Sequence, residues 1–251
     1  ACLSIFGCAV RRLPPSVLIL ILVPPAIIKA TIEIFIRGSS ATCYSKLRKG
    51  LTKSIPSVGV TELLWVRLQL NINRAMTFSG GQIRKSKWQG RIEYHGLDKL
   101  LNCVNSGRPV LLASLHYGSP RDASIIIRSQ GVRLSSLAYS PLTPLEQKSW
   151  NTRVELWGLQ SVPYIFLPTD MWEIRDFLCE PSNALLMLIE TMNTQRHVTV
   201  PFLGGQIRAG KGIIKFAEMT DAVVIPVACT STGFLRWRLF FGNGMVYDGD
   251  V

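Results

Sequence analysis

The stretch IEYHGLDKLLNCVNSGRPVLLASLHYGS, residues 92–119, sets out the fold of this chain of 251 residues. Its first residues alternate as in a strand, and a helix is expected over 97–104, between a glycine turn and Asn-Ser-Gly. The apolar run 110–112, which opens VLLASL, then predicts a buried strand that ends at His116. A strand, a helix and a second strand in succession indicate an α/β protein.

The same alternation continues to the end of the chain. Periodicity predicts helices over 122–130, 145–156, 171–179 and 210–222, and strands over 162–166, 184–189, 223–230 and 234–242. We therefore expect a single layered α/β domain over residues 41–251, with helices covering a largely buried mixed sheet. We also expect this domain to be truncated at its C-terminus, because YDGDV stops without a terminating pattern.

The charge of the chain points to an anionic surface. The net charge is +12 although 47% of the residues are hydrophobic. Residues 37–91 contain eleven Lys or Arg residues and one acidic residue, Glu62. Such a segment attracts anionic lipid, nucleic acid or an acidic protein. No nucleic-acid-binding motif accompanies it, so we expect a membrane surface and no nucleic acid, with a basic nucleic-acid binder as an alternative. The six cysteines are scattered without metal-ligand spacing, so no metal site is expected.

Residues 1–40 are predicted to be a hydrophobic, membrane-associating segment. Its apolar run, 17–28, contains Pro24-Pro25 and is shorter than the roughly 20 residues that a spanning helix needs. The prolines also interrupt the hydrogen bonds of a helix. This favours an interfacial or re-entrant helical anchor over a full span, and a structural pair of helices is the alternative.

His116 is the candidate catalytic base. Open sheets place their chemistry beyond the carboxyl ends of strands, and the pKa of imidazole lies near neutrality. Gly118 allows close approach of the backbone, and Pro120 suits the first turn of a helix, whose free N–H groups attract negative charge. A structural histidine at a strand end is the alternative.

Four segments in order resemble the lysophospholipid acyltransferase-like superfamily, in particular its bacterial lipid A late acyltransferase branch of lauroyl and myristoyl acyltransferases. The first is residues 92–119, with a Gly-x-x-x-Leu helix, an apolar strand and His-aromatic-Gly. LAYSPLTPLEQKSWNTRVELWGL (137–159) contains Arg153, and ALLMLIETMN (184–193) has Glu190-Thr191 where the family usually has Asp-Gln. VTVPFLGGQIRAGKGIIKFAEMTDAVVIPV (198–227) is similar to the Pro-Phe-Phe-Gly block with its following helix and strand. The resemblance covers roughly residues 10–245.

The resemblance implies an acyltransferase at the cytoplasmic face of the inner membrane, peripheral or monotopic. Such an enzyme moves a fatty acyl group from a thioester of acyl carrier protein or coenzyme A to a hydroxyl or amine of a lipid or glycolipid. His116 would deprotonate the acceptor, and a carboxylate would orient it, with no bound cofactor besides the acyl thioester co-substrate. Because a thioester is already activated, a positioned base worth about 10² to 10⁴ in rate suffices. We expect substrate contacts from Tyr117, Gly118, Arg121, Arg153, Phe202, Gly204, Arg208 and Lys211, the cationic ones through phosphates.

The carboxylate departs from the family pattern, which is His, four residues, then Asp or Glu. Arg121 occupies that position and Asp122 follows it, about 100° further around a helix. Asp122 replaces the family carboxylate if the turn takes up the extra residue, and Glu190 is the next candidate. Asp122 could equally be a helix N-terminal carboxylate without a catalytic role. The departure also motivates an alternative function, a lapsed or repurposed homologue that binds an acyl carrier protein or lipid without transfer.

Overall fold

The computed structural model describes residues 89–116, 118–159, 165–190, 197–202, 205–233 and 236–247, together with positions 17, 24, 25, 27, 28 and 68. Apart from those positions and residues 89–91, the predicted anchor over 1–40 and the basic segment 37–91 lie outside the described residues. Tyr117, Gly204 and the last four residues of the chain also lie outside them. Within the described ranges, no helix is long and apolar enough to cross a membrane.

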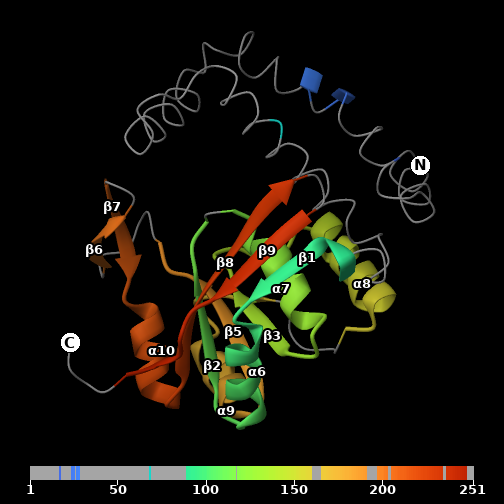
Figure 1. The fold of residues 1–251 in the computed structure, drawn as a ribbon. Helices are drawn as coiled ribbons and strands as arrows, with labels where there is room; N and C mark the ends of the chain where they lie inside the picture. Colours follow the sequence, from blue (N-terminus) through green and yellow to red (C-terminus); the bar gives the residue numbers. More distant parts are fainter. Residues whose placement is uncertain are drawn as a thin grey trace.

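In the part of the chain that the structure describes, eight strands form one mixed, mostly parallel sheet (Figure 1). The order across the sheet is β1-β9-β8-β2-β5-β3-β4, with β10 paired to β8. Strands β8, β2, β5, β3 and β4 run parallel, β9 and β10 run antiparallel to β8, and β1 runs parallel to β9. The bounds are β1 (Ile92–His95), β2 (Val110–Ser114), β3 (Arg133–Leu137), β4 (Ile165–Phe166), β5 (Asn183–Leu188), β8 (Val223–Gly233), β9 (Arg236–Phe241) and β10 (Met245–Val246).

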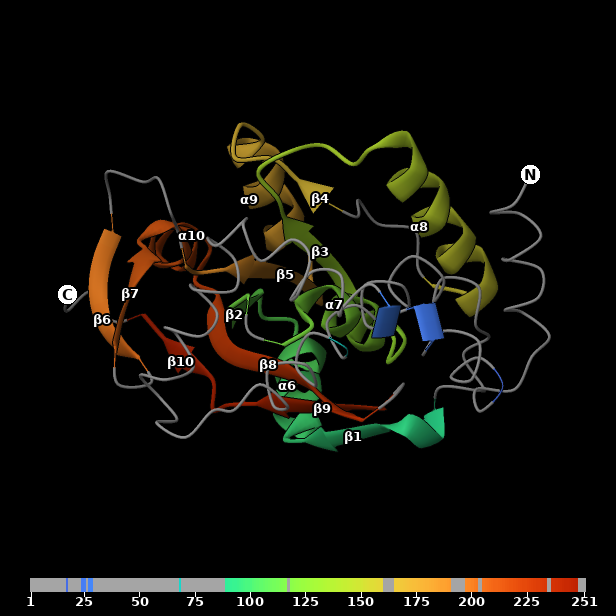
Figure 2. The ribbon, with the colours of Figure 1, turned by 90° about the horizontal axis from the view of Figure 1, so that it is seen from above.

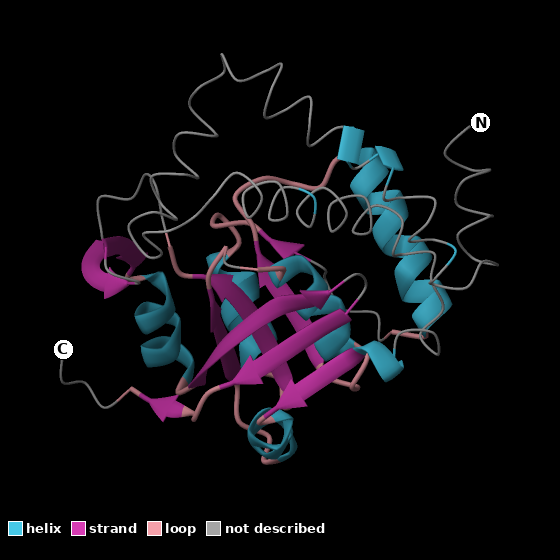
Figure 3. Ribbon diagram, turned by 45° about the horizontal axis from the view of Figure 1, so that its top comes forward, coloured by secondary structure: helices cyan, strands magenta, loops and turns pink. Residues whose placement is uncertain are grey.

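Helices cover both faces of this sheet. The hydrophobic core on one face includes side chains of α6 (Leu97–Asn105), α7 (Pro120–Arg128) and α8 (Pro144–Trp157). The core on the other face includes side chains of α9 (Met171–Cys179) and α10 (Gly212–Thr220). A short 3-10 helix, η3 (Gln89–Arg91), precedes β1, and a separate hairpin of β6 (His197–Phe202) and β7 (Gly205–Gly210) lies beside α10 (Figures 2 and 3).

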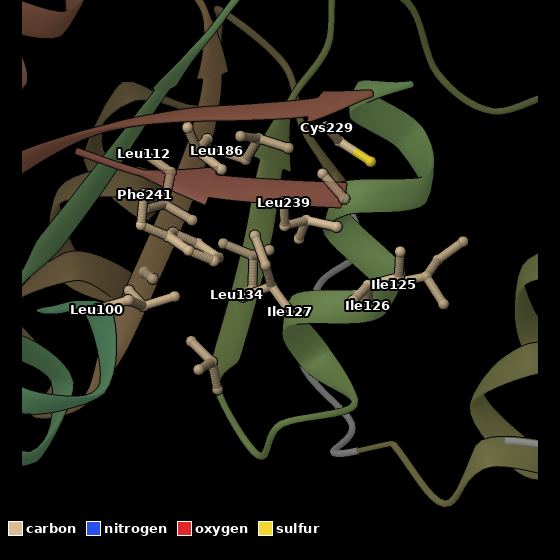
Figure 4. Packing of buried hydrophobic residues seen from close by; sticks show 14 of the residues in the cluster. Leu100, Leu112, Ile125, Ile126, Ile127, Leu134, Leu186, Cys229, Leu239 and Phe241 are labelled. Atoms are coloured by element: carbon tan, nitrogen blue, oxygen red, sulfur yellow. The ribbon is translucent and has the colours of Figure 1, made fainter. Parts of the chain in front are cut away.

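The central position of β2 explains why its first four residues are all apolar. Val110 and Leu112 belong to the core with α7, whereas Leu111 belongs to the core with α9 and α10. Side chains alternate between the two faces of a strand, so a strand buried on both faces needs apolar residues in succession. Figure 4 shows Leu112 and Leu186 of the neighbouring strand in the core that contains Ile125 to Ile127 of α7.

The predicted α/β class is confirmed, with a mixed, mostly parallel sheet and helices. The predicted helices and strands over 92–116, 145–156, 171–179, 184–189 and 210–242 correspond to observed elements. Helix α7 begins two residues earlier than predicted, at Pro120, which suits the first turn of a helix. Of the strand expected over 162–166, the structure describes only residues 165 and 166, which form β4.

Strand β3, the β6–β7 hairpin and β10 were not predicted from the sequence pattern. Strand β3, RLSSL, contains Ser135 and Ser136, which interrupt the apolar pattern although Ser135 is fully buried. Strand β10 has two residues, too few for any periodicity to be visible.

Candidate active site

The ends of β2 and β5 bring the candidate base to a carboxylate. These strands are parallel neighbours, with Ser114 paired to Leu188, and the Ile189 N–H donates to the Ser114 carbonyl oxygen at 2.9 Å. Continuing this register by two residues sets His116 opposite Glu190. Two residues separated by 74 positions in the chain therefore meet at the carboxyl edge of the sheet.

The His116 and Glu190 side chains are in direct contact. Nδ1 of His116 lies 3.0 Å from Oε1 of Glu190, and the backbone N–H of His116 donates to the same oxygen. When Nδ1 carries the proton and donates a hydrogen bond to the carboxylate, Nε2 keeps a lone pair and can act as a base. The His116 side chain is 64% exposed, so a substrate can reach it, whereas that of Glu190 is only 25% exposed.

The second oxygen of the Glu190 carboxylate lacks a hydrogen-bond donor within the described ranges. Oε2 of Glu190 is buried and has no hydrogen-bond partner among the described residues. A buried carboxylate oxygen without a donor is costly, and it is less costly when the carboxylate faces a cation. A positive charge formed on the His116 ring during a reaction would therefore lie beside a carboxylate that can stabilise it.

The turn after His116 is fixed by strand β8. The Ser119 N–H donates to the Cys229 carbonyl oxygen at 2.8 Å, and Gly118 forms a parallel bridge with Cys229. Gly118 has a φ of 76°, and a Cβ atom there would lie 2.0 Å from the Cys229 oxygen. Only glycine therefore fits this turn, which holds His116 at the edge of the sheet.

Asp122 points into the protein interior. It is 5% exposed, and its carboxylate accepts a hydrogen bond from Nε1 of Trp237, on β9, at 3.1 Å. Because α7 begins at Pro120, Asp122 lies in the first turn of that helix. Of the roles that the sequence left open, this position favours a helix N-terminal carboxylate, and the carboxylate in contact with His116 is that of Glu190.

Arg121 extends toward solvent at the start of α7. Its side chain is 65% exposed, and Nη1 lies 3.4 Å from Oε1 of Glu146. Glu146 forms a capping box with Thr143 at the start of α8. The pKa of Glu146 is lowered, first by the hydrogen bond from the Thr143 backbone N–H and to a smaller degree by the charge of Arg121. Because most of its side chain is exposed, the arginine can contact a ligand at the edge that carries His116 while it pairs with Glu146.

Strand β7 brings two further predicted residues toward Glu190. Glu190 forms an antiparallel bridge with Ala209, and the Gly210 N–H donates to the Ile189 carbonyl oxygen at 2.7 Å. Arg208 and Lys211 flank these two residues and are exposed.

Two other predicted substrate residues have different positions. Phe202 pairs with Gly205 at the far end of the hairpin from Ala209, so the structure does not bring it to His116. Arg153 lies in α8, and its side chain is outside the described part of the structure. The contacts that the resemblance implied for these two residues remain predictions.

Cys229 and Trp237 support the site, although no sequence pattern marked them. Burial, and secondarily the charge of Asp122, raises the pKa of the Cys229 thiol, so this thiol stays neutral. Both residues are about 1% exposed, and they contact the turn and the helix that follow His116. The described residues contain no group of three His, Cys, Asp or Glu side chains that could hold a metal ion.

Comparison with protein-family models finds none that matches this chain, and no curated protein matches it. The class of protein is therefore defined by the fold and the site alone. It is an α/β protein with a mixed, mostly parallel sheet of eight described strands, and it has a histidine–glutamate pair beyond the carboxyl ends of two central parallel strands.

Proposed function

We propose that this protein is a membrane-associated acyltransferase of the lysophospholipid acyltransferase-like kind. The observation that carries the proposal is the contact between Nδ1 of His116 and Oε1 of Glu190 at 3.0 Å, at an accessible edge of the sheet. The four ordered sequence motifs that resemble this superfamily support the same conclusion. The donor is an acyl thioester of acyl carrier protein or coenzyme A, and the acceptor is a hydroxyl or amine of a lipid or glycolipid.

In the proposed reaction His116 is the general base. Nε2 takes the proton of the acceptor hydroxyl while its oxygen attacks the thioester carbonyl carbon. The tetrahedral intermediate then collapses, the C–S bond breaks, and the imidazolium returns the proton to the leaving thiolate. The products are an ester, or an amide if the acceptor is an amine, and a free thiol. Glu190 holds the ring and stabilises its positive charge during the reaction.

Three exposed cations are suited to the phosphates of the substrates. Arg121 begins the helix after the base, and Arg208 and Lys211 flank the residues that contact the end of β5. A guanidinium forks to phosphate oxygens, and a lysine ammonium attracts them as a point charge. Phosphates occur in the phosphopantetheine arm of both thioester donors and in lipid headgroups. The proposed N-terminal anchor over residues 1–40 would keep this edge at the cytoplasmic face of the inner membrane.

To test this proposal, the purified chain is incubated with a lipid extract and an acyl thioester of acyl carrier protein or coenzyme A whose acyl group is radiolabelled. A new labelled lipid is expected, and His116→Ala should lower its rate of formation by about 10² to 10⁴. His95→Ala is the matched control, because His95 also contacts a glutamate, Glu93, at 2.6 Å but lies at the end of β1, which runs opposite to β2. Equal rates for wild type and His116→Ala would exclude the proposed base.

One observation favours a second function, a homologue that binds an acyl carrier protein or lipid without transfer. Arg121 occupies the position at which the superfamily has its carboxylate, and it contacts Glu146. The same incubation separates the two functions. Retention of the labelled carrier protein or lipid by the chain, with no acylated product, would support binding without transfer.

A further inference from the structure

Two aromatic side chains near the carboxyl edge of the sheet are the most exposed large hydrophobic residues in the described structure. Tyr139 is 71% exposed and Trp172 is 66% exposed. Tyr139 follows the end of β3, and Trp172 lies in the first turn of α9, after β4. The Ala138 N–H donates to the Phe166 carbonyl oxygen at 2.9 Å, so the two strand ends stay together. Strands β3 and β4 run parallel to β2 and β5, so these aromatics belong to the edge that carries His116.

The same edge carries cations. Arg208 and Lys211 are exposed beside the bridge to Glu190, and no carboxylate of the described residues forms an ion pair with either of them. Arg175 lies 5.5 Å from the centre of the Trp172 ring and also pairs with Asp176.

We propose that this carboxyl edge rests on the headgroup layer of an anionic lipid bilayer, with Tyr139 and Trp172 as its aromatic anchors. Tyrosine and tryptophan prefer this layer because the ring is apolar while the OH or N–H can bond to headgroups and water. Arg208 and Lys211 would lie against the anionic headgroups, which attract basic residues within a Debye length. The proposal rests on the proposed function insofar as that function requires a lipid acceptor to reach His116.

The orientation can be measured through Trp172 itself. The chain of 251 residues is bound to vesicles of phosphatidylcholine and phosphatidylglycerol that contain brominated acyl chains, which quench nearby tryptophan fluorescence. The contribution of Trp172 is the difference between wild type and Trp172→Phe. The other five tryptophans are present in both proteins, so their signal cancels in the difference. Quenching of the Trp172 component is expected, and an unquenched component in a vesicle-bound chain would overturn the proposal.

A second measurement tests the two anchors together. Replacing Tyr139 and Trp172 with serine should weaken vesicle binding about tenfold, because interfacial affinity follows the apolar area that enters the headgroup region. Met245→Ser is the matched control: Met245 is 53% exposed, but it pairs with the beginning of β8, at the opposite edge of the sheet. An equal loss of binding in the two variants would contradict the proposed orientation.

A parallel assay keeps this inference separate from the proposed function. Acyl transfer by the wild-type chain is measured with a water-soluble, short-chain alcohol as acceptor, with and without vesicles. Quenching of Trp172 without any transfer would support the membrane-facing edge and count against the acyltransferase. Transfer without quenching of Trp172 in the bound chain would support the enzyme and overturn the membrane-facing edge.

Discussion

The Asp122 carboxylate accepts a hydrogen bond from the Trp237 indole at 3.1 Å, and both side chains are almost completely buried. This contact joins the first turn of α7 to β9, directly after the turn that carries His116. Removing the carboxylate should therefore affect stability as well as any activity.

Asp122→Ala is expected to lower the free energy of unfolding by about 1–3 kcal/mol, because the buried indole N–H loses its acceptor. Asp122→Asn keeps an acceptor oxygen in the same place and should cost less. Urea denaturation followed by tryptophan fluorescence measures both values. If Asp122→Asn lowered the free energy of unfolding as much as Asp122→Ala, the negative charge of Asp122, and not its acceptor oxygen, would be the stabilising feature.

Glu190→Gln is expected to lower the rate of acyl transfer by at least about tenfold, with little loss of folded protein. The amide cannot balance the positive charge that His116 acquires when it takes a proton, although it can still hydrogen-bond to the ring. Steady-state transfer assays measure the rate, and far-ultraviolet circular dichroism checks the fold. Glu93→Gln, at the exposed pair of β1, is the control and should leave the rate unchanged.

Gly118→Ala is expected to destabilise the protein by more than about 3 kcal/mol, since its Cβ would lie 2.0 Å from the Cys229 oxygen. Gly107→Ala separates this clash from backbone strain, because Gly107 has a similar φ of 78° and open space around it. That control should cost only about 1–2 kcal/mol. Thermal unfolding measures the two losses, and equal losses would mean that the turn moves away from β8 to admit a side chain.

Stability should fall as the pH rises from 10 toward 12. Burial raises the pKa of Tyr94 to about 12, whereas the ordinary value of 10 applies in the unfolded chain. Over this range the unfolded tyrosine loses its proton while the folded one keeps it, so the folded state binds more protons and deprotonation favours unfolding. Denaturant unfolding at several pH values measures the slope of the free energy of unfolding against pH.

Tyr94→Phe should reduce this slope but not abolish it, because the buried Cys229 thiol has a raised pKa and acts in the same direction. An unchanged slope in Tyr94→Phe would mean that Tyr94 ionises as readily in the folded protein as in the unfolded chain.

The elements with strong periodicity could be predicted from the sequence, and they include the two strands that carry the site. A short apolar run such as 110–113, in a segment bounded by turn residues, favours a buried strand, so His116 was expected just after a strand end. Strand β3 could not be predicted, because the burial of Ser135 depends on its neighbours in the sheet and not on its own hydropathy.

The site could be predicted only in part, for a similar reason. Glu190 was a candidate because ALLMLIETMN resembles the strand that ends in Asp-Gln in the acyltransferase superfamily. The register that sets it opposite His116 depends on pairing between distant strands. Spacing alone could not assign Asp122, since the direction of its side chain depends on where α7 begins. Pairing and helix phase are tertiary properties, and one sequence does not specify them.

The central position of β2 and β5 has a consequence for the order in which parts of the protein unfold. Strands buried on both faces are the last to exchange their amide hydrogens, because exposing them requires global unfolding. His116 and Glu190 extend from these strands, so thermal fluctuations at the periphery should leave their separation intact. On warming, the contact between His116 and Glu190 would then persist until the whole domain unfolds cooperatively.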